Sequence, residues 1–582
     1  MHDRLIRQLQ KVFTVSNPKT SSSQVIFWFS LSLTFSVLYS AIALQEAFSS
    51  AYVVQDDARQ HVFWMQRFLD PTLFNHDLIA NYFQSVAPAG YSALYQLAAA
   101  VGVNPLVFNK LLPLLLGLLT SSYCFGVCLE ILPVPVAGFI ATLLLNQNLW
   151  IGSDDLVSAT PKAFADLLLL AFLYYLLKRS LLPCLVAIAL LGLFYPQGVF
   201  LCAGILILQL VKWQSGRLRV SQDQHDYLFC GAGLGVALLV MLPYALRASE
   251  FAPVITAAQA RNLPEFAPGE RSEFFQEQPK DFWLNGKRSG LFHKALLTPV
   301  TLCAGLLLPV LRLFPSRFPL IKQLKPSILV LPQLLLVSLG MFFAAHAVLF
   351  KLHLPSRYTS HSFRIIVTLA SGIALTVMLD AVLDWASVRV KSYLSWRQFI
   401  ALGTTVLIGA TLILYPSFVK NFPHTAYIVG RVPLLYEFFQ KQPKDSLIAS
   451  LADEANNIPT FAQRSILVGR EYAIPYHLGY YSQFRQRTLD LIQAQYSPDW
   501  TEVQGFIQKY GVDFWLLDAG AFTPEYLANN RWLQPFAPAT EEALENLKQG
   551  TLPALSSVMK KCSVIETESL VVLRAACLAS AP

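Results

Sequence analysis

The sequence predicts an α-helical polytopic membrane protein that carries a small α/β domain outside the membrane. Hydrophobic residues make up 54% of the 582 residues and charged residues only 14%, whereas charged residues make up about 25% of ordinary soluble domains. Mean hydropathy is +0.46, and apolar windows recur along the chain up to residue 416. This balance excludes a cytosolic enzyme, a small secreted domain, a disordered chain and a nucleic-acid-binding arm.

Eleven apolar windows predict transmembrane helices, because about 20 helical residues cross the hydrocarbon of a bilayer. The first window is expected to stay as a permanent helix, since no short apolar core with a small-residue cleavage site precedes it. The fifth and sixth windows are joined only by Tyr195, Pro196 and Gln197, so a re-entrant pair is an alternative there. The windows lie near 25–47, 106–129, 133–151, 162–178, 181–195, 197–212, 227–247, 294–313, 327–350, 363–385 and 398–416.

Basic residues predict the orientation, because Lys and Arg are enriched in cytoplasmic loops. With a cytoplasmic N-terminus, the short outside loops hold only Lys162, Lys351 and Arg357. The connections on the other side then carry Arg4, Arg7, Lys11, Lys19, Lys178, Arg179, Lys212, Arg217, Arg219, Arg312, Arg317, Lys322, Lys325, Arg389, Lys391 and Arg397. An odd number of spans places the C-terminal tail outside.

The tail is expected to form an α/β domain, because strand-like and helix-like patterns alternate in it at 465–469, 501–510 and 512–517. Cys562 and Cys577 flank a strand-like stretch there, and an outside location permits a disulfide between them without requiring one. The predicted division is a cytoplasmic segment 1–24, a transmembrane domain 25–416 with outside loops 48–105 and 248–293, and an outside domain 417–582.

The most conspicuous polar group, Gln55 to His61, follows the first window and contains Asp56 and Asp57. If 57–69 is one helix, then Asp57, His61, Trp64 and Phe68 share a face of it. A carboxylate would then lie beside an imidazole at the membrane surface. The alternative is a solvated acidic turn that caps an amphipathic interfacial helix.

Two further clusters fall on the same side of the membrane. Asp154-Asp155 follows the third window, with Lys162 at the entrance of the fourth, and Arg357-Tyr358 precedes the tenth. Loop solvation and anchoring of helix ends are the simpler explanations. Together, however, carboxylates that can take a proton or hold a cation and a guanidinium that can bind phosphate indicate group transfer from a phosphate ester.

These motifs resemble those of the glycosyltransferase C superfamily of polytopic enzymes. Asp56-Asp57 matches its acidic motif in the first outside loop, Asp154-Asp155 is similar to its second acidic motif, and Arg357-Tyr358 is similar to its late Arg-Tyr element. The resemblance implies Asp57 or Asp56 as general base, and a donor phosphate held by Arg357, Tyr358 and Lys162. No Trp-Trp-Asp motif of oligosaccharyltransferases is present, so peptide glycosylation is disfavoured.

The resemblance further implies a polyprenyl-phosphate sugar as donor and a glycan, lipid or protein hydroxyl as acceptor, with inversion at the anomeric carbon. Asp57, His61 and Asp154-Asp155 could bind Mg²⁺ or Mn²⁺. Such a cation is not required, because Arg or Lys can neutralise the leaving phosphate instead. No nucleic-acid partner is expected, and the expected location is a bacterial inner membrane.

Two alternatives from other classes remain open. A transporter or lipid flippase would place coupling residues near the bilayer midplane, where Asp166, His346 and Asp380 are the few candidates. A catalytically silent scaffold would keep the fold and use its outside domain to bind partners.

Overall fold

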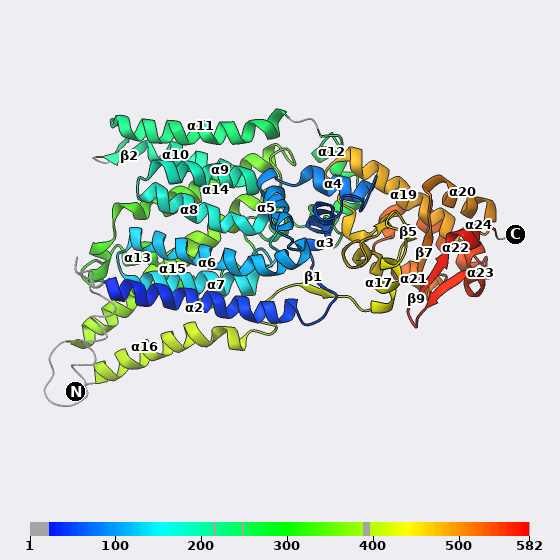
Figure 1. The fold of residues 1–582 in the computed structure, drawn as a ribbon. Helices are drawn as coiled ribbons and strands as arrows, with labels where there is room; N and C mark the ends of the chain where they lie inside the picture. The colour runs from blue at the N-terminus through cyan, green and yellow to red at the C-terminus, as the bar shows by residue number, and fades with distance from the viewer. Residues whose placement is uncertain (1–21, 215–216, 247–248, 388–395, 581–582) are drawn as a thin grey trace.

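The computed structural model describes residues 22–214, 217–246, 249–387 and 396–580. The predicted cytoplasmic segment 1–24 lies almost entirely outside these residues, as do Arg389 and Lys391. In Figure 1 the long helices run side by side at one end of the molecule, and the C-terminal strands and helices lie at the other end.

The structure is mostly helical, as expected for an integral membrane protein, and helical segments lie in all eleven predicted windows. Six helices of the described chain are long and apolar enough to cross a membrane: Ser22–Ala47, Pro105–Ile131, Gln224–Leu246, Pro326–Ala347, Arg357–Ser387 and Trp396–Phe418. The helices of the fourth, fifth and sixth windows have only 13, 14 and 13 residues, which at about 1.5 Å per residue falls short of a bilayer. A count of eleven spans therefore stays a prediction.

The helices of the bundle have bounds close to the predicted windows. They are α2 (Ser22–Ala47), α6 (Pro105–Ile131), α7 (Pro135–Gly152), α8 (Ala165–Leu177), α9 (Leu181–Phe194), α10 (Gln197–Gln209), α11 (Gln224–Leu246), η5 (Val300–Leu307), α13 (Leu308–Leu311), α14 (Val330–Ala347), α15 (Arg357–Ser387) and α16 (Trp396–Leu414). Shorter elements of the same part are η2 (Pro161–Phe164), β2 (Val211–Gln214), β3 (Arg217–Val220), η6 (Pro319–Gln323), η7 (Pro326–Leu329) and η8 (Tyr415–Phe418).

The buried helix α15 lies close against α7. A Cβ added at Gly372 would lie 2.6 Å from the backbone nitrogen of Ala141, so only glycine permits this approach. The close packing fixes the N-terminal end of α15, with its Arg357, His361 and Arg364, beside the loop that follows α7.

The loop 48–105 after α2, here called the first loop, differs from the expectation of one amphipathic helix over 57–69. It forms β1 (Val53–Gln55), α3 (Ala58–His61), the 3-10 helix η1 (Phe63–Phe68), α4 (Leu78–Val86) and α5 (Ala89–Ala100). Three consecutive side chains, Phe63, Trp64 and Met65, are at most 1% exposed. A helix lying on a surface buries one face only, so a segment enclosed on all sides cannot present the predicted face. The single face shared by Asp57, His61, Trp64 and Phe68 was therefore a wrong prediction.

The loop 248–293 contains α12 (Ala257–Arg261), η3 (Pro264–Phe266) and the π-helix η4 (Asp281–Asn285). Phe266 and Phe274 of this loop form a small core together with Phe350, which lies between α14 and α15. The amide of Ile255 donates to the carbonyl of Tyr476, and the amide of Leu478 donates to the carbonyl of Pro253. The loop is thereby joined to the C-terminal region.

The C-terminal region contains a five-stranded sheet in the order β6-β5-β7-β9-β8. β5 is parallel to β6 and β7, whereas β9 is antiparallel to β7 and β8. Cys562 and Cys577 form a disulfide across a Cα–Cα distance of 5.6 Å. A separate strand, β4 (Tyr427–Val429), pairs antiparallel with β1 of the first loop, which ties the first loop to the C-terminal region.

The strands of the sheet are β5 (Leu447–Ser450), β6 (Ser465–Ile466), β7 (Phe514–Asp518), β8 (Ser563–Glu566) and β9 (Leu570–Arg574). The helices of this region are α17 (Pro433–Gln440), η9 (Asp453–Asn457), α18 (Ile458–Phe461), η10 (Arg470–Tyr472), α19 (Leu478–Tyr496), α20 (Trp500–Tyr510), α21 (Pro524–Asn529), η11 (Gln534–Phe536), α22 (Ala539–Lys548), α23 (Ala554–Cys562) and α24 (Ala575–Ala579).

Candidate functional site

Three carboxylates surround one lysine where the ends of the helices meet the first loop. The Nζ atom of Lys162, in η2, lies 2.6 Å from Oδ2 of Asp57, 2.8 Å from Oδ1 of Asp154 and 3.6 Å from Oδ1 of Asp155. Asp57 immediately precedes α3, and the other two carboxylates follow α7. The structure therefore brings together two acidic motifs that are almost 100 residues apart in the sequence.

A buried arginine of α15 extends this cluster into the bundle. Arg364 donates to Oδ2 of Asp155 at 2.9 Å, to Oδ2 of Asp166 at 2.6 Å and to Oδ1 of Asn148 at 2.9 Å. Nδ1 of His361, almost one turn earlier on α15, lies 3.1 Å from the same oxygen of Asp166. The planar guanidinium has several donors in a fixed arrangement, so it holds Asp155 in one orientation.

Arg357 lies at the start of α15 and interacts electrostatically with Asp155 and Asp57. In the part of the chain that the structure describes, its guanidinium has no hydrogen-bond or ion-pair partner. The next residue, Tyr358, is buried and donates its hydroxyl to the carbonyl of Leu352 at 2.8 Å. Of the Arg-Tyr pair, the arginine is therefore the side chain available to an anion.

Two buried polar atoms near Arg357 also lack partners among the described residues. They are the hydroxyl of Tyr195, in the turn between α9 and α10, and Nε2 of His361. The two rings meet edge to face, with centroids 5.4 Å apart. Because buried polar groups in folded proteins are nearly always hydrogen-bonded, this pair adds hydrogen-bonding capacity beside the guanidinium.

Close to Asp56, a buried glutamate of the C-terminal region joins three segments. Glu471 accepts hydrogen bonds from Arg59 at 3.3 Å and from Gln60 and Arg271. Arg59 also pairs with Asp56. The first loop, the loop 248–293 and η10 therefore meet at one carboxylate, which fixes the acidic motif against the C-terminal region.

The environment sets the charge of the groups at the site. Burial alone would raise the pKa of Asp57, but the neighbouring Lys162 and His61 lower it below its ordinary value. The pKa of Asp155 is likewise held well below its ordinary value, because the cations around it outweigh its burial. Burial lowers the pKa of His61 to about 4 and raises the pKa of Glu471. At neutral pH the site therefore combines ionised aspartates with a neutral His61.

The sequence pointed to most of the polar residues that meet here, but not to those that orient them. Asp57, Asp154-Asp155 and Lys162 are in direct contact, and Arg357 lies within electrostatic range of them. Asp56 faces Arg59 instead, and His61 packs edge to face on Phe83.

Arg364, His361 and Glu471 were not predicted. A buried arginine inside or beside an apolar window is itself a signal, because charges in lipid are costly, and this reasoning would have found Arg364. For Glu471, in a polar tail, the sequence offers no such signal.

The predicted metal ligands do not fit a divalent cation as they are arranged. Mg²⁺ or Mn²⁺ would need carboxylate oxygens of Asp57, Asp154 and Asp155 that already converge on the ammonium of Lys162. Within the described ranges, no group of three or more His, Cys, Asp or Glu side chains is arranged to hold a metal ion.

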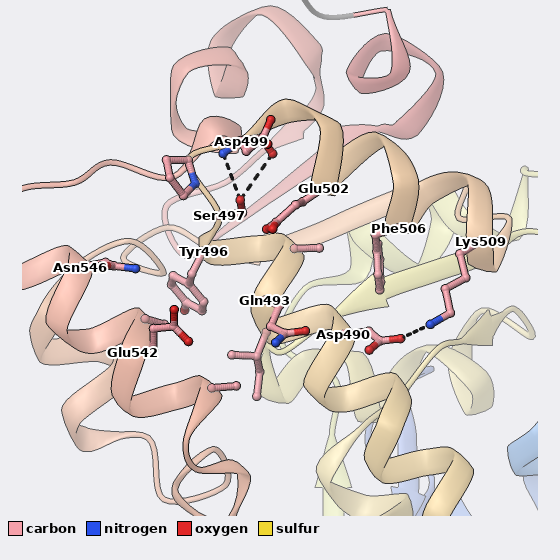
Figure 2. Close-up of a pocket in the computed structure, with 15 residues that line it drawn as sticks. Asp490, Gln493, Tyr496, Ser497, Asp499, Glu502, Phe506, Lys509, Glu542 and Asn546 are labelled. Atoms are coloured by element: carbon pink, nitrogen blue, oxygen red, sulfur yellow. Dashed lines mark hydrogen bonds and ion pairs between the residues drawn. The ribbon is translucent and has the colours of Figure 1, made fainter.

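A cavity of about 590 Å³ lies elsewhere, in the C-terminal region (Figure 2). Its lining comes from α19, α20, α22 and the turn before α20, and includes Tyr496, Glu502 and Glu542. Asp490 and Lys509, which both belong to its lining, form an ion pair at 2.6 Å (Figure 2). None of its lining residues belongs to the cluster around Lys162, so the cavity is a separate feature.

No protein-family model and no curated protein sequence matches the chain. Its structure is similar to solved structures of the Archaeoglobus fulgidus oligosaccharyltransferase. The apo form has a TM-score of 0.56 at 13% identity and covers 90% of this chain and 73% of its own. A complex of that enzyme, AglB, with an inhibitory peptide and a dolichol-phosphate has a TM-score of 0.52 at 13% identity, with 89% and 72% covered. A complex with zinc and sulfate has a TM-score of 0.50 at 14% identity, with 88% and 70% covered.

ArnT from Cupriavidus metallidurans bound to undecaprenyl phosphate is also similar, with a TM-score of 0.45 at 13% identity, and covers 97% of this chain and 100% of its own. The chain thus has the fold of the glycosyltransferase C enzymes, as the motifs predicted.

Proposed function

We propose that this protein is a membrane glycosyltransferase that moves a sugar from a polyprenyl-phosphate donor to an acceptor hydroxyl on the extracytoplasmic side. One observation carries the proposal. In a glycosyltransferase C fold, the two predicted acidic motifs converge on one site beside an arginine that has no hydrogen-bond or ion-pair partner among the described residues. Carboxylates and a guanidinium available to an anion match the two needs of the reaction, which are a base for the acceptor and a cation for the leaving phosphate.

Asp57 is the proposed general base. Its low pKa keeps it ionised and able to accept a proton, although a low pKa also makes it a weak base. The acceptor hydroxyl becomes acidic only as its oxygen bonds to the anomeric carbon, so the proton moves late. Lys162 also contacts Asp154, and a shift of its ammonium toward that carboxylate would raise the basicity of Asp57.

Arg357 is the proposed ligand of the donor phosphate. As the bond between the anomeric carbon and the phosphate oxygen breaks, negative charge accumulates on the phosphate, and a guanidinium can donate hydrogen bonds to two of its oxygens side by side. The unpartnered hydroxyl of Tyr195 can donate to a third oxygen. The dolichol-phosphate complex of AglB is the reason to place a lipid phosphate there.

The proposal is tested with the purified full-length protein in lipid nanodiscs. Polyprenyl-phosphate sugars are supplied with candidate glycan and lipid acceptors, and the released polyprenyl phosphate and the glycosylated product are both quantified. We expect stoichiometric release and product, with inverted configuration at the anomeric carbon by NMR, because a single displacement inverts it. Movement of the lipid-linked sugar across the bilayer without any covalent product would instead support a flippase.

A further inference from the structure

We propose that the ammonium of Lys162 permanently occupies the cation position of this acidic site, so that the protein needs no divalent metal there. Where the inference concerns catalysis it rests on the proposed function. Where it concerns metal binding it rests on the geometry alone.

The position of the ammonium is that of a shared counter-ion. Nζ contacts Asp57 at 2.6 Å and Asp154 at 2.8 Å, and forms a longer ion pair with Asp155 at 3.6 Å. The lysine side chain is only 15% exposed. An ammonium has three donors and no acceptor, so two carboxylates at hydrogen-bond distance and a third at ion-pair distance suit it as partners.

An ammonium and a divalent cation cannot share this position. Mg²⁺ binds carboxylate oxygens at about 2.0–2.1 Å, which would place it in the volume that Nζ fills. Two cations a few ångströms apart in a half-buried site also repel each other strongly. A metal could enter only if the lysine side chain withdrew from all three aspartates.

Most of the local negative charge is already compensated without a metal. Asp57, Asp154, Asp155 and Asp166 bring four negative charges, and Lys162 and Arg364 neutralise two of them through direct ion pairs. Arg357 supplies a third positive charge within electrostatic range. A bound phosphate would then meet cations that belong to the protein itself.

The tethered ammonium has a distinct role in the reaction. It connects Asp57, the proposed base, to the second acidic motif. In this way it fixes the orientation of the Asp57 carboxylate relative to Arg357, the proposed ligand of the donor phosphate. The sugar transfer itself is unchanged. The bond to the phosphate breaks, the bond to the acceptor oxygen forms, and the acceptor proton goes to Asp57, with no bond made to Lys162.

Removal of the lysine should allow the three carboxylates to close around a metal ion. In Lys162→Ala, the three carboxylates lose their cation and become free oxygen ligands. We expect Mn²⁺ titration followed by electron paramagnetic resonance to show one bound Mn²⁺ per chain in Lys162→Ala. The wild type and the Lys162→Arg variant, which keeps the charge, should bind at least ten-fold more weakly. Adding Asp154→Asn to Lys162→Ala should abolish the gain.

Lys110→Ala is the matched control, because the ammonium of Lys110 lies over the ring of Phe48. Its loss should not create Mn²⁺ binding. Sugar transfer by the wild type should persist in excess chelator. Stoichiometric Mn²⁺ binding by the wild type, or transfer that a chelator abolishes and Mn²⁺ restores, would overturn the inference. So would a folded Lys162→Ala protein that binds no Mn²⁺. A protein without transfer activity that still shows the expected Mn²⁺ pattern would refute the proposed function and leave the cation site in place.

Discussion

At the scale of single residues, Asp57 meets two opposing demands. A general base should have a pKa near the working pH, yet the pKa of Asp57 is lowered by the ion pair with Lys162. The same pair keeps the carboxylate ionised and oriented in a partly buried place, where an unpaired charge would be costly. The network around Lys162 therefore fixes the orientation of the Asp57 carboxylate at the cost of its basicity.

Arg357 provides a test of donor recognition. Arg357→Gln removes the charge and the paired donors, and we expect the KM for the polyprenyl-phosphate donor to rise about 10- to 100-fold, in line with the loss of a charge-assisted hydrogen bond of about 1.5–3 kcal/mol. The KM for the acceptor should stay unchanged. Because the guanidinium has no intramolecular partner among the described residues, the variant should keep the thermal stability of the wild type. A donor KM that did not change would contradict the role given to Arg357.

His61 predicts a pH dependence of stability. Its pKa falls to about 4 in the folded protein because the side chain is buried, with Asp57, Lys162 and Arg271 acting on it as well. Its ordinary value is about 6.5. Between these values the unfolded chain binds a proton that the folded chain does not, so stability should decrease as the pH falls from 6.5 to 4.

Asp57 and Asp155 have lowered pKa values, so their stabilising effect is lost only below about pH 4. Melting curves of the wild type and His61→Gln between pH 7 and pH 4 separate these effects. The melting temperature of the variant should fall less steeply over that range, and parallel curves would show that His61 is not the titrating group.

At the scale of elements, α15 determines the site more than any other helix does. The predicted window begins at residue 363, whereas the helix begins at Arg357, because the polar turn that carries Arg357 and His361 lowers the local hydropathy. The apolar windows could be recognised because helices in lipid need long apolar runs. The split of the first loop into α3 and η1 could not, since it depends on burial by segments that are distant in the sequence.

The junction at Glu471 predicts coupling between elements. Glu471→Ala would leave Arg59 and Arg271 without their shared carboxylate in a buried place. Breaking a buried ion pair in this way typically costs about 3–5 kcal/mol, so we expect a clear loss of thermal stability and weaker transfer. Glu502→Ala, an exposed glutamate of the same region, is the control and should leave both properties unchanged. Equal stability of the two variants would contradict a structural role of the junction at Glu471.

At the candidate site, too, some features could be predicted from the sequence and others could not. Asp57, Asp154-Asp155 and Arg357 could be singled out because ionisable residues at the ends of apolar windows are few and face one side. The position of Lys162 among three carboxylates could not be inferred, because distances between loops do not follow from a hydropathy pattern.

At the scale of the whole molecule, the account needs the first loop and the C-terminal region on the same side of the membrane. The pairing of β1 with β4 and the contacts of Glu471 join these two parts directly. In Figure 1 they lie together beyond one end of the helices, while β2 lies at the opposite end.

Cysteine labelling in intact cells tests this orientation. Glu545→Cys, in the C-terminal region, should react with a membrane-impermeant maleimide in intact spheroplasts. Arg219→Cys, on β3, should react only after permeabilisation, because the positive residues near it are expected in the cytoplasm. The unsubstituted chain reports the background, and the reverse pattern would place the acidic site in the cytoplasm.

The most direct test of the account compares three proteins in one assay of sugar transfer from a polyprenyl-phosphate donor: the wild type, Asp57→Asn and Asp70→Asn. Asp70 belongs to the same loop but pairs with Lys444 near the surface. The account predicts that Asp57→Asn folds normally and transfers about 10²- to 10⁴-fold more slowly, while Asp70→Asn matches the wild type. Full transfer by Asp57→Asn would contradict it.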